Sequence, residues 1–235
     1  MLEAGEVNEN DIILEVGPGK GALTEKLLEK AKKVIAVEKD DRLIVYLQEK
    51  FASEIATGKL EIIHDDILNF DFSFKQLQAT SYKLIANIPY YITGQFLRKF
   101  LETDFQPERI VVMVQKEIAD RIITKDGKES LLSLSVKAYG IPKKMMKVDK
   151  ENFSPAPKVD SAILLISNIS KKFFSDNRID EKKFFEILHA GFAHKRKILA
   201  SNLKGFLRPE KISRLKPNIR AEDLKLSDWR ELLED

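Results

Sequence analysis

A buried strand that runs directly into a glycine-rich turn restricts the fold of this chain more than any other feature. Residues 11–16 are largely apolar, and Gly17, Gly19 and Gly21 follow at once. Glycine lets the backbone approach a ligand closely, and a helix that begins here offers free N–H groups in its first turn. The pattern predicts a strand, a ligand-binding turn and a helix in direct succession, as in open α/β sheets.

Strands and helices alternate along the first half of the chain. Apolar runs and helical spacing predict strands at residues 34–37, 60–63, 82–86 and 110–114 and helices at residues 21–31, 40–51, 92–101 and 117–123. Alternation of this kind favours a parallel, doubly wound sheet. We therefore expect an α/β protein with a Rossmann-like sheet.

The pattern then changes. Predicted strands at residues 144–149 and 161–166 flank a proline-rich segment that is too short for a crossover helix, so we expect an antiparallel hairpin at the sheet edge. After a predicted linker at residues 167–179, one face of a long helix is marked by Phe184, Leu188, Phe192, Leu199 and Leu203. We expect a catalytic domain at residues 1–168 and an all-helical domain at residues 169–235.

Composition excludes several kinds of site. The 235-residue chain has no cysteine, which excludes disulfides, thiolate catalysis and cysteine-ligated metals, and its three histidines show no metal-binding spacing. We expect no metal site. No apolar run reaches the roughly 18 residues of a membrane span, and no signal peptide is recognisable. These observations fit a cytoplasmic protein without a membrane partner, and we expect a monomer.

Charge is unevenly distributed along the chain. Residues 1–70 contain 15 acidic and 9 basic residues, whereas residues 195–220 contain nine basic residues and one acidic residue. A basic segment of this kind favours a polyanionic partner, with nucleic acid the leading candidate. The candidate RNA-binding residues are Lys195, Arg196, Lys197 and Lys204.

The glycine turn fits two classes of cofactor. It satisfies G-x-G-x-x-G/A, and Glu38, which ends the second predicted strand, has the place of a ribose partner, so a dinucleotide is one possibility. Glu15, two residues before Gly17, gives the Glu-x-Gly-x-Gly form common in S-adenosylmethionine enzymes. A cationic sulfonium also tolerates an acidic surround better than a pyrophosphate does. We therefore favour S-adenosyl-L-methionine, bound by Gly17, Gly19 and Glu38.

An acidic residue follows the third predicted strand. Asp66 is placed to accept a hydrogen bond from the adenine amino group of the cofactor. Asp65 is adjacent, and the exit from a strand does not distinguish the two carboxylates.

Asn87, Ile88, Pro89 and Tyr90 follow the fourth predicted strand. The amino group of adenine is a weak nucleophile because its lone pair is delocalised into the ring. The Asn87 side chain and the Ile88 carbonyl could accept its two hydrogens and so localise that lone pair, while Pro89 fixes the loop and Tyr90 stacks on the base. Methyl transfer to adenine is the chemistry that this motif favours.

Phe153 precedes the proline-rich segment and could close the other face of the base. Taken by itself, a phenylalanine that anchors the loop by packing is the simpler interpretation.

These residues together carry a family resemblance over nearly the whole chain. The chain resembles the KsgA family of rRNA adenine N6,N6-dimethyltransferases at residues 15–24, 37–38, 66, 87–90, 115–117, 153–161, 192, 195–197, 202–203 and 220–224. The Asn-Ile-Pro-Tyr motif is shared with the Erm enzymes, which methylate large-subunit rRNA. The segments at residues 153–161 and 220–224 are more similar to those of KsgA.

The resemblance implies two methylations on each of two adjacent adenosines, in the hairpin near the 3′ end of small-subunit rRNA. It implies S-adenosylmethionine as the methyl donor, bound at Gly17, Glu38, Asp66 and Asn87, and Asn87 would also serve the target amine. The partner would be the immature small ribosomal subunit, held by the basic C-terminal helices.

One feature departs from the family pattern. Family members carry a Gly-Gln-Asn-Phe-Leu-type motif that helps to cover the cofactor and the RNA, whereas only 16 residues precede Gly17 here and they contain no such motif. The chain therefore looks short at its N-terminus, and we expect weak cofactor binding and low activity.

Three other functions remain open at this point. The scaffold could serve as an rRNA-binding assembly factor with little turnover, or as an Erm-type methyltransferase of large-subunit rRNA. A dinucleotide oxidoreductase is the remote alternative, because no residue resembles a hydride-transfer acid or base.

Overall fold

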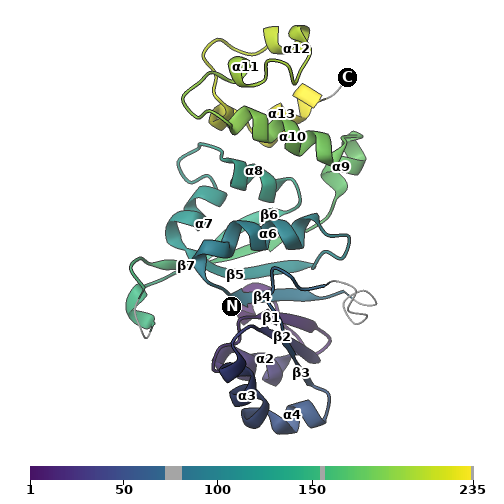
Figure 1. Cartoon of the computed structure of the whole chain (residues 1–235), viewed down its shortest axis with the longest axis vertical. Helices are drawn as coiled ribbons and strands as arrows, with labels where there is room; N and C mark the ends of the chain where they lie inside the picture. The colour runs from purple at the N-terminus through teal and green to yellow at the C-terminus, as the bar shows by residue number, and fades with distance from the viewer. Residues whose placement is uncertain (72–80, 154–156, 234–235) are drawn as a thin grey trace. The chain divides into compact units, whose positions relative to one another are not determined.

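The computed structural model describes residues 1–71, 81–153 and 157–233 (Figure 1). The chain forms two compact units. The first contains Met1–Ala119 and Ile141–Ile169, and the second contains Asp120–Gly140 and Ser170–Asp235. The second unit therefore holds more than the predicted residues 169–235. Residues 120–140 join it because helix α8 (Leu131–Lys137) packs against helix α10 (Glu181–Phe192) and the Glu129 N–H donates to the Glu222 carbonyl at 2.8 Å.

A seven-stranded mixed sheet forms the centre of the first unit, in the order β3-β2-β1-β4-β5-β7-β6. The strands are β1 (Ile12–Val16), β2 (Lys33–Glu38), β3 (Leu60–His64), β4 (Lys83–Asn87), β5 (Arg109–Gln115), β6 (Ile141–Val148) and β7 (Ser161–Ser167). Strands β1 to β5 pair in parallel, whereas β7 runs antiparallel to both β5 and β6. The expected parallel core and antiparallel edge hairpin are both confirmed.

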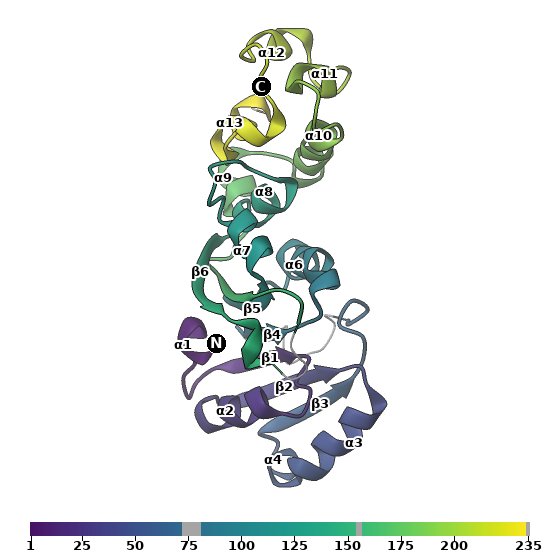
Figure 2. The ribbon, with the colours of Figure 1, turned by 90° about the vertical axis from the view of Figure 1, so that its left-hand side faces the viewer.

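Helices cover both faces of this sheet. The described helices of the first unit are α1 (Leu2–Gly5), α2 (Ala22–Lys30), α3 (Asp41–Lys50), α4 (Ala52–Ala56) and α6 (Thr93–Glu102), and α7 (Lys116–Ile122) crosses its boundary. Helices α1 and α6 lie on opposite faces of the sheet (Figure 2). Leu27 and Leu28 of α2 join Ile13 and Ile85 of the central strands in one buried cluster. Burial on both faces explains why the central strands are continuously apolar.

The second unit is helical in the part of the chain that the structure describes. Its described helices are α8 (Leu131–Lys137), α9 (Lys172–Asn177), α10 (Glu181–Phe192), α11 (Leu199–Asn202), α12 (Pro209–Ser213) and α13 (Leu226–Leu233). Helix α9 lies within the segment predicted as a linker. None of the described helices is long and apolar enough to cross a bilayer.

The prediction of one long helix that carries both Phe184 and Leu203 is wrong. Helix α10 ends at Phe192, and α11 begins only at Leu199. The Asn202 side-chain amide closes the break, because it donates to the carbonyls of Gly191 at 2.6 Å and of His194 at 3.2 Å. Leu199 and Leu203 are nevertheless fully buried, so the apolar spacing correctly identified core residues but not the interruption.

Candidate active site at the carboxyl edge of the sheet

The strand order reverses direction between β1 and β4. From β1 the chain proceeds to β2 and β3 on one side, and β4 and β5 then continue on the other side. In the parallel pairing, Val16 lies opposite Ala86, so the segments that follow both strands leave at the same edge. Ligands of open α/β sheets bind at this reversal of strand order.

Gly17 brings the glycine turn against the motif that follows β4. Its φ of +70° lies in the left-handed region, and a Cβ atom at this position would lie 2.8 Å from the Asn87 backbone oxygen. That separation is shorter than real Cβ contacts, so the close approach requires glycine. Two segments 70 residues apart in sequence thus meet at one edge of the sheet.

Glu38 holds the glycine turn in place. This buried carboxylate accepts a hydrogen bond from the Gly19 N–H at 3.2 Å through Oε2, and from the N–H groups of Lys39 and Asp40 at 2.8 and 3.0 Å through Oε1. The end of β2 is therefore fixed to the turn that follows β1. The hydrogen bond between the Gly19 N–H and Glu38 was not predicted from the sequence.

Glu15 is a fully buried carboxyl group beneath the turn. Neither of its carboxyl oxygens, nor the hydroxyl of Thr24 in α2, has a hydrogen-bond partner of standard geometry among the described residues. Burial raises the pKa of Glu15 to about 7; the nearby Thr24 hydroxyl lowers it in part, and the charge of Glu38 raises it further. The chain thus keeps a carboxyl group buried next to the glycine turn.

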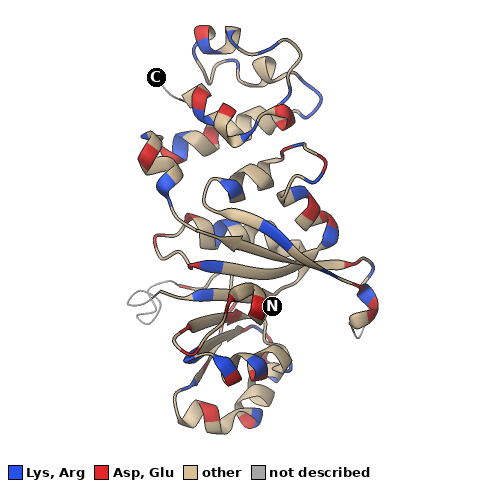
Figure 3. Cartoon of the chain, turned by 180° about the vertical axis from the view of Figure 1, so that it is seen from behind, with Lys and Arg blue, Asp and Glu red and all other residues tan. Residues whose placement is uncertain are grey.

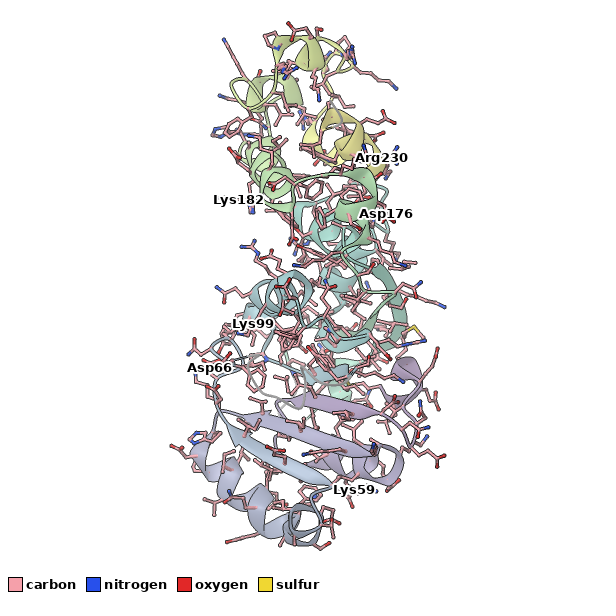
Figure 4. All side chains as sticks on the ribbon, turned by 90° about the vertical axis from the view of Figure 1, so that its right-hand side faces the viewer. Lys59, Asp66, Lys99, Asp176, Lys182 and Arg230 are labelled. Atoms are coloured by element: carbon pink, nitrogen blue, oxygen red, sulfur yellow. The ribbon has the colours of Figure 1, made fainter. Side chains whose placement is uncertain are left out.

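Asp65 and Asp66 lie beyond β3 at the same edge. The Asp66 carboxylate accepts from the Lys39 ammonium at 2.7 Å and from the Leu68 N–H at 3.0 Å, and Lys39 lowers the pKa of Asp66. The Asp65 carboxylate accepts the Asp66 N–H at 2.7 Å. Asp66 and Lys99 of α6 are visible on neighbouring segments in Figure 4. The pairing with Lys39 was not predicted, although this lysine directly follows Glu38 in sequence.

The motif after β4 combines an exposed amide with anchored neighbours. Asn87 ends β4 opposite Met113 of β5, and its side chain is exposed, whereas Ile88 is buried. The Thr93 hydroxyl donates to the Tyr90 carbonyl at 2.9 Å and fixes the turn into α6. Tyr90 is half-buried, so part of its ring remains available to a ligand.

The sequence profile of the ribosomal RNA adenine dimethylases matches residues 1–234 of this chain. The chain belongs to the ribosomal RNA adenine dimethylase family. The dimethylase is 42% identical over 240 residues to the ribosomal RNA small subunit methyltransferase A of Dehalococcoides mccartyi (strain CBDB1), an alignment that covers 99% of this chain and 81% of that protein. It is 37% identical to the Fusobacterium nucleatum protein of the same name, over 99% of this chain and 89% of that protein.

Solved structures agree with this assignment. A dimethyladenosine transferase from Plasmodium falciparum matches with a TM-score of 0.80 and 26% identity, over 99% of this chain and 92% of that one. The 23S rRNA methyltransferase ErmE has a TM-score of 0.78 at 22% identity, over 99% and 95% of the two chains, which shows a shared fold. The predicted family and the Rossmann-like methyltransferase fold are confirmed.

Two further candidate regions lie elsewhere in the sequence: Phe153 with the loop after β6, and the basic segment after α10. Phe153 is half-buried, and its N–H donates to the Lys150 carbonyl at 3.2 Å, whereas residues 154–156 of the same predicted loop lie outside the described residues. The basic candidates occupy the break between α10 and α11 and the turn after α11, rather than the face of one helix. All four are exposed: Lys195, Arg196, Lys197 and Lys204. Figure 3 shows where Lys and Arg lie along the ribbon.

Proposed function

We propose that this dimethylase transfers methyl groups from S-adenosyl-L-methionine to the exocyclic amino groups of adenines in small-subunit rRNA. The observation that carries the proposal is the close approach of Gly17 to the Asn87 carbonyl, which joins the cofactor turn to the base-binding motif. Relatives that are 34–42% identical are named as small-subunit rRNA methyltransferases, which supports the choice of substrate.

The residues at the turn fit the cofactor. Gly19 leaves the backbone open to a close ligand, because no atom would lie within 4 Å of a Cβ there, and Glu38 has acceptor capacity beyond its three backbone donors. We infer that Glu38 accepts from the ribose hydroxyls and that Asp66 accepts from the adenine amino group. Bound S-adenosylmethionine would supply an electrophilic methyl group on a positively charged sulfur.

Asn87 and Ile88 would orient the target amine. The exposed Asn87 side chain offers a carbonyl oxygen at the carboxyl edge of the sheet, and the rigid turn at Pro89, with φ −56° and ψ 135°, sets the direction of the Ile88 carbonyl. Two acceptors on the two amine hydrogens localise the nitrogen lone pair and point it toward the methyl donor. This is catalysis by positioning, without a general base of shifted pKa.

Tyr90 and Phe153 would enclose the base. A tyrosine ring that is half-buried provides a rigid stacking surface at little entropic cost, and Phe153 would contact the opposite face. We propose that the exposed basic residues between α10 and α12 bind phosphates of the immature small subunit, with the enzyme acting as a cytoplasmic monomer.

Replacement of Asn87 tests the proposal. We expect Asn87→Ala to reduce labelled-methyl transfer to immature small subunits by about 10²–10³-fold, because one acceptor of the amine is lost. Asn10→Ala is the matched control, since Asn10 is exposed and precedes β1 at the opposite edge of the sheet. Equal transfer by Asn87→Ala and wild type would contradict the assignment.

The same assay separates the alternatives. An Erm-type enzyme would label naked large-subunit rRNA, and an assembly factor would bind immature small subunits without transferring label. A dinucleotide oxidoreductase would bind neither substrate.

A further inference from the structure

We propose that Ser161 is a positioning residue for methyl transfer, which holds the Tyr90 ring at the angle needed to stack on the target adenine. The Tyr90 and Ser161 hydroxyls share a hydrogen bond with an Oη–Oγ distance of 2.6 Å. The bond links the Asn-Ile-Pro-Tyr motif to the first residue of β7. This inference rests on the proposed function, because it concerns the base-stacking role of Tyr90.

Strand pairing explains why these residues meet. Asn87 of β4 lies opposite Met113 of β5, which in turn lies opposite Ile163 of β7. Because β7 is antiparallel, its first residue, Ser161, lies two residues beyond that row at the carboxyl edge. Tyr90 extends beyond Asn87 toward the same edge. The antiparallel direction of β7 is therefore what brings Ser161 to the active-site edge.

Ser161 is held firmly enough to act as an anchor. It is fully buried between Gln115 of β5 and Val148 of β6. A fully buried side chain in a close-packed interior, on a strand that is paired along both edges, has little rotational freedom. A ring that bonds to it is correspondingly restricted.

Asp160, the residue before Ser161, makes three polar contacts with neighbouring segments. The Asp160 carbonyl accepts the Lys116 N–H at 2.9 Å, and its carboxylate accepts the Lys150 N–H at 3.2 Å and pairs with the Lys147 ammonium at 2.9 Å. These contacts fix both ends of the connection between β6 and β7, which also carries Phe153. The two aromatic residues proposed to enclose the base thus depend on one hairpin.

The bond has a specific consequence for catalysis. A half-buried ring without it would still fit its site but would sample more than one orientation. The cofactor would bind as before, and RNA affinity, which depends mainly on phosphate contacts, would change little. Loss of the hydrogen bond would lower kcat, because fewer encounters place the amine in line with the methyl group.

Three variants test the inference: Ser161→Ala, Tyr90→Phe and the double variant. We expect each single change to lower kcat for labelled-methyl transfer by about three- to tenfold, the range that one hydrogen bond supports. The double variant should be no worse than either single variant, since all three lack the same bond. KM for rRNA and the Kd for S-adenosylmethionine should change less than twofold.

Ser167→Ala is the matched control, because Ser167 ends the same strand and bonds only weakly to the Ile141 carbonyl at 3.5 Å. We expect this variant to retain wild-type kcat. Urea unfolding of each variant, at the assay temperature, establishes that the chains are folded.

Several outcomes overturn the inference. A folded Ser161→Ala variant with wild-type kcat removes the positioning role, and so does a double variant whose loss is the product of the single losses. A Tyr90→Phe loss far beyond that of Ser161→Ala assigns the tyrosine hydroxyl a role of its own instead. Absence of adenine methylation by the wild-type chain overturns the proposed function itself, and this inference with it.

Discussion

At the scale of single residues, the site depends on carboxylates in contrasting surroundings. Glu38 is buried but satisfied by three backbone N–H groups, and Asp66 is partly exposed and paired with Lys39. Glu15 has neither kind of compensation among the described residues, and burial raises its pKa to about 7. An uncompensated buried carboxyl group is favoured in its neutral form, so it makes stability depend on pH.

The sign of that dependence follows from the two pKa values. The pKa of Glu15 rises from its ordinary value of 4.5 to about 7 in the folded chain, so its neutral form stabilises the fold fully below pH 4.5. This contribution is lost as the pH rises through 7. Glu15→Gln stays neutral throughout, so its stability relative to wild type should increase by about 2–3 kcal/mol between pH 5 and pH 8.

Urea unfolding at several pH values measures this difference. Glu49→Gln serves as the control, because Glu49 is an exposed acid of α3 and its replacement should leave the pH profile unchanged. Parallel stability profiles for Glu15→Gln and wild type would show that Glu15 is charged in the folded chain at neutral pH.

At the scale of elements, the proposed active site is a junction between the turn after β1 and the motif after β4. Gly17→Ala introduces a Cβ atom 2.8 Å from the Asn87 oxygen, in addition to an unfavourable positive φ. We expect methyl transfer to fall by at least about 100-fold, because a displacement of about 1 Å in a positioned site has that effect. Binding of S-adenosylmethionine should weaken as well.

The Gly58→Ala variant separates the effect of the steric clash from the effect of the positive φ. Gly58 has a φ of +75°, but no atom would lie within 4 Å of its Cβ. This control should cost about 1–2 kcal/mol of stability and leave transfer unchanged. Comparable activity of the Gly17 and Gly58 variants would indicate that the junction is not needed for catalysis.

The elements also show what sequence patterns can predict. Strands β1 to β5 were recognisable because a strand buried on both faces is continuously apolar, and Asp40 correctly marked the start of α3, where it accepts the Arg42 N–H at 2.9 Å. Helix α8 was missed although Ser130 caps it through the Ser133 N–H. The break after α10 depends on Asn202, a long-range contact that apolar spacing does not encode.

The site itself was predictable only in part. Local patterns predicted Gly17, Glu38 and Asn87 as site residues, because each directly follows or ends a strand. The bonds of Glu38 to Gly19 and of Tyr90 to Ser161 depend on strand order and direction, which bring together residues 19 and 71 positions apart. No pattern within a single element specifies such contacts.

At the scale of the whole molecule, acidic and basic residues are concentrated in different parts of the chain. The acidic N-terminal part surrounds a cationic cofactor in the proposed function, and the basic segment at residues 195–220 would bind phosphate.

Lys195→Gln with Lys197→Gln should raise KM for rRNA without lowering kcat. The slope of log affinity against log salt should become shallower by about 1.5, if both lysines displace counterions.

Lys30→Gln with Lys32→Gln is the control of equal charge. Both lysines are exposed, and they lie near the opposite edge of the sheet, where the Lys32 N–H donates to the carbonyl of Asp11 at 3.0 Å. Filter-binding titrations over a salt series compare the two pairs. Identical slopes would mean that net charge, rather than the segment between α10 and α12, determines RNA binding.

The most direct measurement is mass mapping of both ribosomal RNAs after immature subunits are incubated with the wild-type chain and S-adenosylmethionine. The proposed function predicts two added methyl groups on each of two adjacent adenosines near the 3′ end of small-subunit rRNA, and none on large-subunit rRNA. Methyl groups on large-subunit rRNA, or no methylation of either RNA while the chain binds both the cofactor and the small subunit, would contradict it.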